Sequence, residues 1–226
     1  MENDEVAPHD VMPITLYGNA ILRRRAPDVV EFGAELAALI DQMFETLYAT
    51  EHGVGLSANQ VGRTERVFIF DLRDGQIGHV VNPVVTVGSE LERDDEACLS
   101  VPGIGLTTTR SSSATVRGVD KVGAPVEYDG VGLMARCFQH ELDHLNGKLY
   151  IDHHPAEVRK RVERAVHELP WYGNPALDPR SELYAAEPPD EAADDSAKPE
   201  RADPESAHAE PQDPESEGDG RLTTTP

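Results

Sequence analysis

Two histidines stand four residues apart in the segment His140-Glu141-Leu142-Asp143-His144. If this segment is helical, both imidazoles leave the same face one turn apart and can bind one divalent metal ion. Glu141 lies between them, where its carboxylate can take a proton from a water that the metal activates. The competing interpretation is a solvated helix face that happens to carry two histidines. The spacing favours metal-dependent hydrolysis.

A catalytic metal site of this kind needs a third protein ligand and an open position. In one class of proteases the third ligand is a histidine six residues after the second, but that position holds Tyr150. In another class it is a glutamate further along, for which Glu163 and Glu168 are candidates on a strongly charged helix. Cys98 is the rival ligand. A lone cysteine is most often a small core residue, although a metal can itself form the thiolate.

A glycine-rich loop, Gly53-Val54-Gly55-Leu56-Ser57-Ala58-Asn59-Gln60, is the third segment with chemical potential. It partly matches the dinucleotide-binding fingerprint, but that fingerprint follows a strand and this loop follows a predicted helix. The loop has another use, because backbone without side chains can lie close to an extended ligand. The amide of Gln60 can then donate a hydrogen bond to a developing oxyanion.

Periodic apolar residues predict the elements that must position these segments. A first helix follows from the spacing of Leu36, Leu39, Ile40, Met43, Phe44, Leu47 and Tyr48. Strands are predicted over residues 67–70, 80–87, 115–119 and 125–128, with a short edge strand over 13–17. Pro83 indicates an edge or a bulge. Further helices are predicted over residues 133–146, before Gly147, and from Pro155 to Pro170.

This order of strand, helix, several strands and then helices predicts an α+β fold rather than βαβ alternation. We expect antiparallel β-sheets packed around a central metal-binding helix that carries His140 and His144, with an N-terminal and a C-terminal helix. Leu133 and Cys137 continue the face of the two histidines. That face is therefore expected to point inward.

Charge and composition divide the chain and exclude several classes of protein. Residues 175–226 hold 15 acidic and 4 basic residues and 9 of the 17 prolines, so we expect a disordered tail. Residues 1–12 are expected to be a flexible N-terminus, which leaves residues 13–174 as one catalytic domain. The net charge of −22 argues against nucleic-acid binding. The chain shows neither a long apolar run nor a secretory signal, and its two cysteines favour a reducing, cytoplasmic location.

Taken together, the segments 53–60, 96–100 and 140–145 resemble the three motifs of peptide deformylases, in the same order and with similar spacing. The resemblance covers residues 13–171. It implies removal of the N-formyl group from the N-terminal methionine of new proteins, with N-formylmethionyl peptides as substrates and transient contact with the ribosome and nascent chain. The metal of this family is usually Fe²⁺, and Zn²⁺, Ni²⁺ or Co²⁺ are accepted.

The resemblance also implies roles for individual residues. Cys98, His140 and His144 would bind the metal, and Glu141 would act first as general base and then as acid. Gln60 and the backbone N–H of Leu99 would stabilise the oxyanion, while Gly55 would hydrogen-bond the substrate backbone. Further candidates are Val54, Leu133 and Cys137 for the methionine slot or the core, and Glu96 paired with Arg110 to brace the loop that carries Cys98.

Two positions depart from the family pattern. Ser57 stands where alanine is usual, and Ala97 stands where glycine is usual. A glycine required for positive φ would make Ala97 cost on the order of 1 kcal/mol. These departures keep open a second interpretation, a non-catalytic or divergent paralogue that binds a formylated peptide.

Overall fold

The computed structural model describes residues 11–50 and 52–173. Within them the elements follow in the order η1 (Ala20–Arg23), α1 (Ala34–Tyr48), β1 (Gly55–Ser57), η2 (Ala58–Val61), β2 (Val67–Asp71), β3 (Ile77–Val87), β4 (Leu91–Ala97), β5 (Gly105–Ser111), β6 (Ser113–Val119), β7 (Pro125–Val131), α2 (Leu133–Leu145), η3 (Tyr150–His153) and α3 (Ala156–Glu168), where η marks a 3₁₀ helix. All the strand pairs among these elements are antiparallel. The predicted α+β class and the three predicted helices are confirmed.

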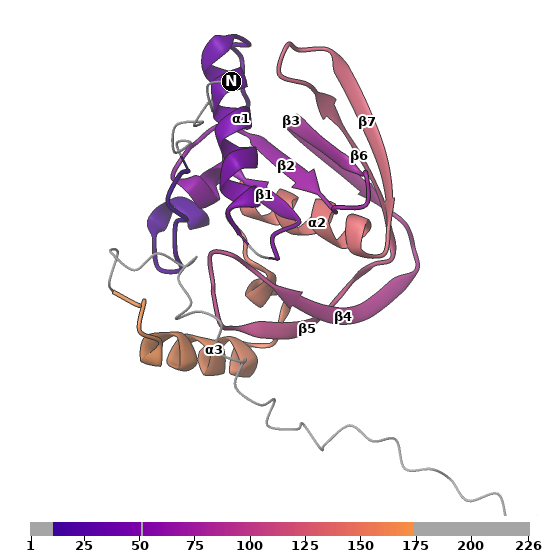
Figure 1. Cartoon of the computed structure of the whole chain (residues 1–226). Helices are drawn as coiled ribbons and strands as arrows, with labels where there is room; N and C mark the ends of the chain where they lie inside the picture. The colour runs from indigo at the N-terminus through magenta and orange to yellow at the C-terminus, as the bar shows by residue number, and fades with distance from the viewer. Residues whose placement is uncertain (1–10, 51, 174–226) are drawn as a thin grey trace, which may run out of the picture. The chain divides into compact units, whose positions relative to one another are not determined.

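A five-stranded sheet in the order β1-β2-β3-β6-β7 separates two layers of the core. Along β2 the side chains alternate, as the pleat requires. Val67 and Ile69 pack in the cluster that contains the apolar face of α1. Phe68 and Phe70 pack in the cluster that contains α2. The helix with the two histidines thus lies against this sheet, as Figure 1 shows, and the expected central position of that helix is confirmed.

The pair of strands β4 and β5 forms a separate two-stranded sheet, and the sequence analysis predicted neither strand. The reason is composition: five of the seven residues of β4 are charged, in Leu91-Glu92-Arg93-Asp94-Asp95-Glu96-Ala97. Apolar alternation appears when one face of a strand packs on an apolar core, and β4 has no such face, because its only buried residue is Glu96. This sheet matters for the site because β4 ends directly before Cys98.

Two smaller expectations had different outcomes. Residues 13–17 form no strand, so that prediction was wrong. The segment instead links two motif loops, because Thr15 N–H donates to Gln60 O at 2.6 Å and Tyr17 N–H donates to Ser100 O at 2.8 Å. The irregularity predicted at Pro83 is confirmed as a register shift between Val81 and Val84, with Asn82 at a φ of 53°.

The described part of the chain ends in a third apolar cluster. Trp171 is buried there with Val162 and Val166 of α3, and its indole N–H donates to Pro102 O at 3.1 Å. None of the helices in residues 11–50 and 52–173 is long and apolar enough to cross a membrane. The tail predicted over 175–226 and most of the N-terminus predicted over 1–12 lie outside the described residues.

Candidate metal centre

Three buried side chains from two parts of the chain meet at one point. Helix α2 supplies His140 and His144, and the turn after β4 supplies Cys98. Their ligand atoms all lie within 4.8 Å of one another. The Nε2 atom of His144 lies 3.1 Å from the Sγ atom of Cys98 and 3.2 Å from the Nε2 atom of His140. The predicted juxtaposition of these three residues is therefore present.

The spacing of these atoms fits a shared metal ion. In a tetrahedral site with metal–nitrogen bonds of about 2.0–2.1 Å and metal–sulfur bonds of about 2.3 Å, neighbouring ligand atoms lie roughly 3.3–3.6 Å apart. Burial and the nearby His140 hold the pKa of His144 well below its ordinary value, so this imidazole is neutral, as a ligand must be. Two imidazole nitrogens and a thiol sulfur are also a donor set that suits divalent transition metals.

The other candidates for the third ligand do not join this group. Glu163 and Glu168 are exposed on α3, and the metal-ligating group found among the described residues contains neither. Tyr150 is fully buried, and its hydroxyl donates to Ile104 O at 2.6 Å. The metallopeptidase interpretation with a glutamate ligand therefore lacks its third ligand.

Glu96 fixes the orientation of His140. The Nδ1 atom of His140 lies 2.6 Å from the Oε1 atom of Glu96. Arg110 donates to the same carboxylate through Nε at 3.0 Å and Nη2 at 2.6 Å. Burial opposes ionisation, but the hydrogen bonds from His140 and Arg110 hold the pKa of Glu96 far below its usual range. An ionised Glu96 accepts from Nδ1–H and leaves the Nε2 lone pair of His140 for a metal.

The ion pair expected between Glu96 and Arg110 is therefore present and buried. A second arginine was missed. Arg136 donates through Nη1 to Glu96 at 2.9 Å and to Thr108 O at 2.9 Å. The sequence did contain a signal for it: Arg136 is the one charged residue in an apolar stretch of the helix, one turn before His140, and a charge in such a stretch is buried only when it is paired.

Glu141 is buried beside the ligands. The Ser57 hydroxyl donates to its Oε2 atom at 2.7 Å. Burial raises the pKa of Glu141 to about 7, against the opposing effects of His140 and of the hydrogen bond from Ser57. A carboxyl group with a pKa near neutrality is suited to taking up and returning a proton. The site therefore has a buried carboxyl group of raised pKa at the position predicted for the general base.

Gln60 points its amide nitrogen toward the same point. Its Oε1 atom accepts from the backbone N–H of Ser57 at 2.8 Å. This bond assigns the other end of the amide to Nε2, which lies 3.6 Å from Cys98 Sγ and 3.3 Å from Ser100 Oγ. The N–H of Leu99, in the turn after Cys98, has no hydrogen-bond acceptor within the described part of the chain. The Leu99 N–H is therefore available to a ligand, while Gln60 Nε2 donates to Cys98 Sγ and Ser100 Oγ over long distances.

The apolar candidates divide into two groups. Cys137 is buried, and its thiol lies 3.7 Å from the carbonyl oxygen of Val54. Its sulfur and the carboxylate of Glu141 both lie next to Gly55, so Val54 and Cys137 remain candidates for the wall of the site. Leu133 is 54% exposed, and the expectation that it points inward with the histidines is wrong. It is the first residue of α2, at the end of the helix farthest from His144.

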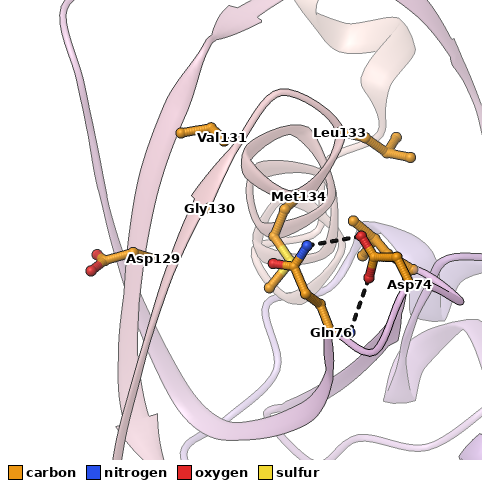
Figure 2. A pocket seen from close by; sticks show the side chains of 8 residues that line it. Asp74, Gln76, Asp129, Gly130, Val131, Leu133 and Met134 are labelled. Atoms are coloured by element: carbon orange, nitrogen blue, oxygen red, sulfur yellow. Dashed lines mark hydrogen bonds between the residues drawn. The ribbon is translucent and has the colours of Figure 1, made fainter.

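Leu133 lines an open pocket at the start of α2. The other residues of this pocket are Leu72, Asp74, Gln76, Asp129, Gly130, Val131 and Met134. Figure 2 shows Asp74 and Gln76 hydrogen-bonded to each other beside Met134, with Leu133 and Val131 on either side of the helix end. The pocket contains none of the metal-ligating residues.

The two departures from the family pattern have different structural consequences. Ala97 is exposed on β4, and it is not among the described residues with positive φ. The cost expected for a residue other than glycine at this position is therefore absent. Ser57, by contrast, donates a hydrogen bond directly to Glu141.

An α+β fold that holds a buried His₂Cys set, with a glutamate between the two histidines, defines a metal-dependent hydrolase. The comparisons with known proteins agree. The family model described as polypeptide deformylase matches residues 11–160. The chain belongs to this family.

In each of these comparisons the matched region spans most of the length of the relative. Peptide deformylase 2 of Streptomyces coelicolor is 44% identical over 72% of this chain and 93% of the relative. The peptide deformylase of Acidothermus cellulolyticus is 44% identical over 72% of this chain and 89% of the relative. The crystal structure of a peptide deformylase from Legionella pneumophila has a TM-score of 0.66 and 36% identity, over 70% of this chain and 94% of that one.

Proposed function

We propose that this protein hydrolyses the N-formyl group from the N-terminal methionine of newly synthesised proteins and releases formate. One observation carries the proposal: Cys98, His140 and His144 converge, the carboxyl group of Glu141 is close enough to His140 for that histidine to lower its pKa, and the amide nitrogen of Gln60 lies 3.6 Å from Cys98 Sγ. Membership of the polypeptide deformylase family supports the same reaction.

A formamide is difficult to hydrolyse because the amine is a poor leaving group and the carbonyl is weakly electrophilic. Cys98, His140 and His144 would hold a divalent metal ion, which would supply a water of lowered pKa and polarise the formyl oxygen. Glu141 would take up a proton from the attacking water and return it to the leaving nitrogen. The amide N–H of Gln60 and the backbone N–H of Leu99 donate to the negative charge that develops on the formyl oxygen.

Strand β1 provides a place for the peptide. It is an edge strand of its sheet, so one side of its backbone is unpaired with other strands. An extended peptide can add to such an edge through main-chain hydrogen bonds, and Gly55 would provide them. Val54 and Cys137 adjoin Gly55 and would contact the methionine side chain, with Leu133 further along α2.

The test of the reaction is multiple-turnover formate release from formyl-Met-Ala-Ser by full-length protein purified without air. Acetyl-Met-Ala-Ser is the matched control, because its extra methyl group does not fit a site built for a formyl group. We expect turnover of the first peptide and none of the second. Binding of formyl-Met-Ala-Ser by metal-replete protein without any turnover would instead identify a non-catalytic paralogue.

We further propose Fe²⁺ as the ion in the cell, with Zn²⁺, Ni²⁺ or Co²⁺ as substitutes, because a thiolate and two imidazoles suit all four. The proposed substrate also favours a cytoplasmic location, where both free cysteines would stay reduced. It also implies transient contact with the ribosome. The exposed basic residues of α3 are available for that contact: Arg159, Lys160, Arg161 and Arg164.

The acidic tail over residues 175–226 is proposed to be dispensable for catalysis. Trp171 already anchors the C-terminal part of the domain to Pro102. A chain that ends at Asn174 is therefore expected to keep kcat/KM for formate release within about 10-fold of the full chain, a difference of about 1.4 kcal/mol. Side-by-side kinetics of the two proteins at equal metal content would check this, and a larger loss would give the tail an active role.

A further inference from the structure

We propose that Ser57 is a positioning residue that holds the general base Glu141 in its working orientation. This inference rests on the proposed role of Glu141 as the base. It concerns the position in the first motif where this chain departs from the alanine that the family usually has.

The hydroxyl of Ser57 is committed to Glu141. Ser57 is fully buried, and its Oγ atom lies 2.7 Å from Oε2 and 3.0 Å from the carbonyl oxygen of Glu141. Both partners of this hydroxyl in the described part of the chain are therefore atoms of one residue. A hydroxyl has one proton to donate, and a carboxylate is the stronger acceptor because the hydrogen bond is then assisted by charge.

Strand β1 also leaves room for the other oxygen of the Glu141 carboxylate. Residues 55 and 57 lie two apart on a strand and so face the same side. A Cβ atom on Gly55 would come within 2.6 Å of the Oε1 atom of Glu141 and 2.7 Å of the Cys137 sulfur. The missing side chain at 55 thus gives Oε1 its space, while the hydroxyl at 57 binds Oε2.

Ser57 also holds the oxyanion donor, through a different atom. Its backbone N–H donates to Gln60 Oε1 at 2.8 Å, which turns the amide nitrogen of Gln60 toward Cys98. Base and oxyanion donor are therefore fixed by the side chain and the main chain of one residue. Replacing the side chain removes the first contact and leaves the second.

The orientation of the carboxylate affects the rate because proton transfer requires its oxygen to lie within hydrogen-bond reach of the proton. A carboxylate that has lost its donor turns more freely and is less often in that position. The loss of kcat on removal of the hydroxyl should therefore be smaller than the loss on removal of the base itself. It should appear in kcat rather than in metal content or substrate affinity, since neither depends on the hydroxyl.

The first variant to measure is Ser57→Ala in the full-length, metal-replete protein. We expect kcat for formyl-Met-Ala-Ser to fall about 10-fold, as expected for loss of a hydrogen bond to an ionised group, with unchanged KM and metal content. Ser57→Thr keeps the hydroxyl and should restore kcat to within about 3-fold of wild type. Ser111→Ala is the matched control, because this buried hydroxyl bonds only backbone carbonyls, among them Gly88 O at 2.9 Å.

The decisive comparison repeats Ser57→Ala in a Glu141→Gln background. If Ser57 acts through the base, adding Ser57→Ala to Glu141→Gln should not lower the residual kcat further. The same 10-fold loss in both backgrounds, wild-type kcat in Ser57→Ala, or an equal loss in Ser57→Thr would each overturn the positioning role. Wild-type activity of Glu141→Gln alone would instead overturn the proposed mechanism, so the two failures are distinguishable.

Discussion

Cys98→Ala, His140→Ala and His144→Ala should each remove the bound metal and with it formate release. A catalytic site keeps three protein ligands and an open position, so two ligands are too few. We expect metal occupancy to fall below about one-tenth of wild type in each variant after dialysis. Elemental analysis of protein purified without air measures the occupancy, and circular dichroism checks that the fold remains.

Glu163→Ala is the control for this series, because Glu163 is the ligand of the alternative metallopeptidase interpretation. It is exposed on α3, and its substitution should leave occupancy and turnover unchanged. Full occupancy in Cys98→Ala together with metal loss in Glu163→Ala would show that the ligand set assigned here is wrong.

Glu141→Gln should separate the chemistry from metal binding. Glutamine keeps the shape of the side chain and can still accept from Ser57, but it cannot take up a proton. We expect kcat to fall by about 10²–10⁴-fold, the range attributed to general acid–base catalysis, with a much smaller change in the affinity for formyl-Met-Ala-Ser. Single-turnover formate release and metal stoichiometry are the two measurements.

Glu157→Gln provides a matched control for this variant, since Glu157 is exposed in the first turn of α3 and should tolerate the change. A metal-replete Glu141→Gln protein that turns over near the wild-type rate would remove Glu141 from the mechanism. A metal-free Glu141→Gln protein would show instead that the carboxylate holds the ligands together.

Much of the fold was predictable because apolar periodicity reports burial. Helix α1 and strands β2, β3 and β6 bury apolar side chains, β7 half-buries Val126 and Tyr128, and the predicted ranges agree with the structure within a few residues. Strand β4 was not predictable in this way. Its charged residues are exposed or half-buried except for Glu96, which is buried by ion pairs rather than by apolar packing. Periodicity does not detect that kind of burial.

The site shows the same division. The spacing of His140 and His144 within one helix, and the resemblance that selected Cys98, identified the residues that converge. The contacts that orient them come from parts of the chain remote in sequence, such as Arg136 on Glu96 and Ser57 on Glu141. Leu133 was misplaced because helical phase predicts the face of a residue but not whether a neighbouring element covers that end of the helix.

The central claim is that one divalent ion, held by Cys98, His140 and His144, makes this chain a deformylase. The most direct measurement is an anaerobic titration of metal-stripped, full-length protein with Fe²⁺, in which formate release from formyl-Met-Ala-Ser is followed at each addition. The account predicts no activity before addition, a linear rise that ends at one ion per chain, and no rise in Cys98→Ala. Full activity in the metal-stripped protein, or the same titration curve in Cys98→Ala, would contradict it.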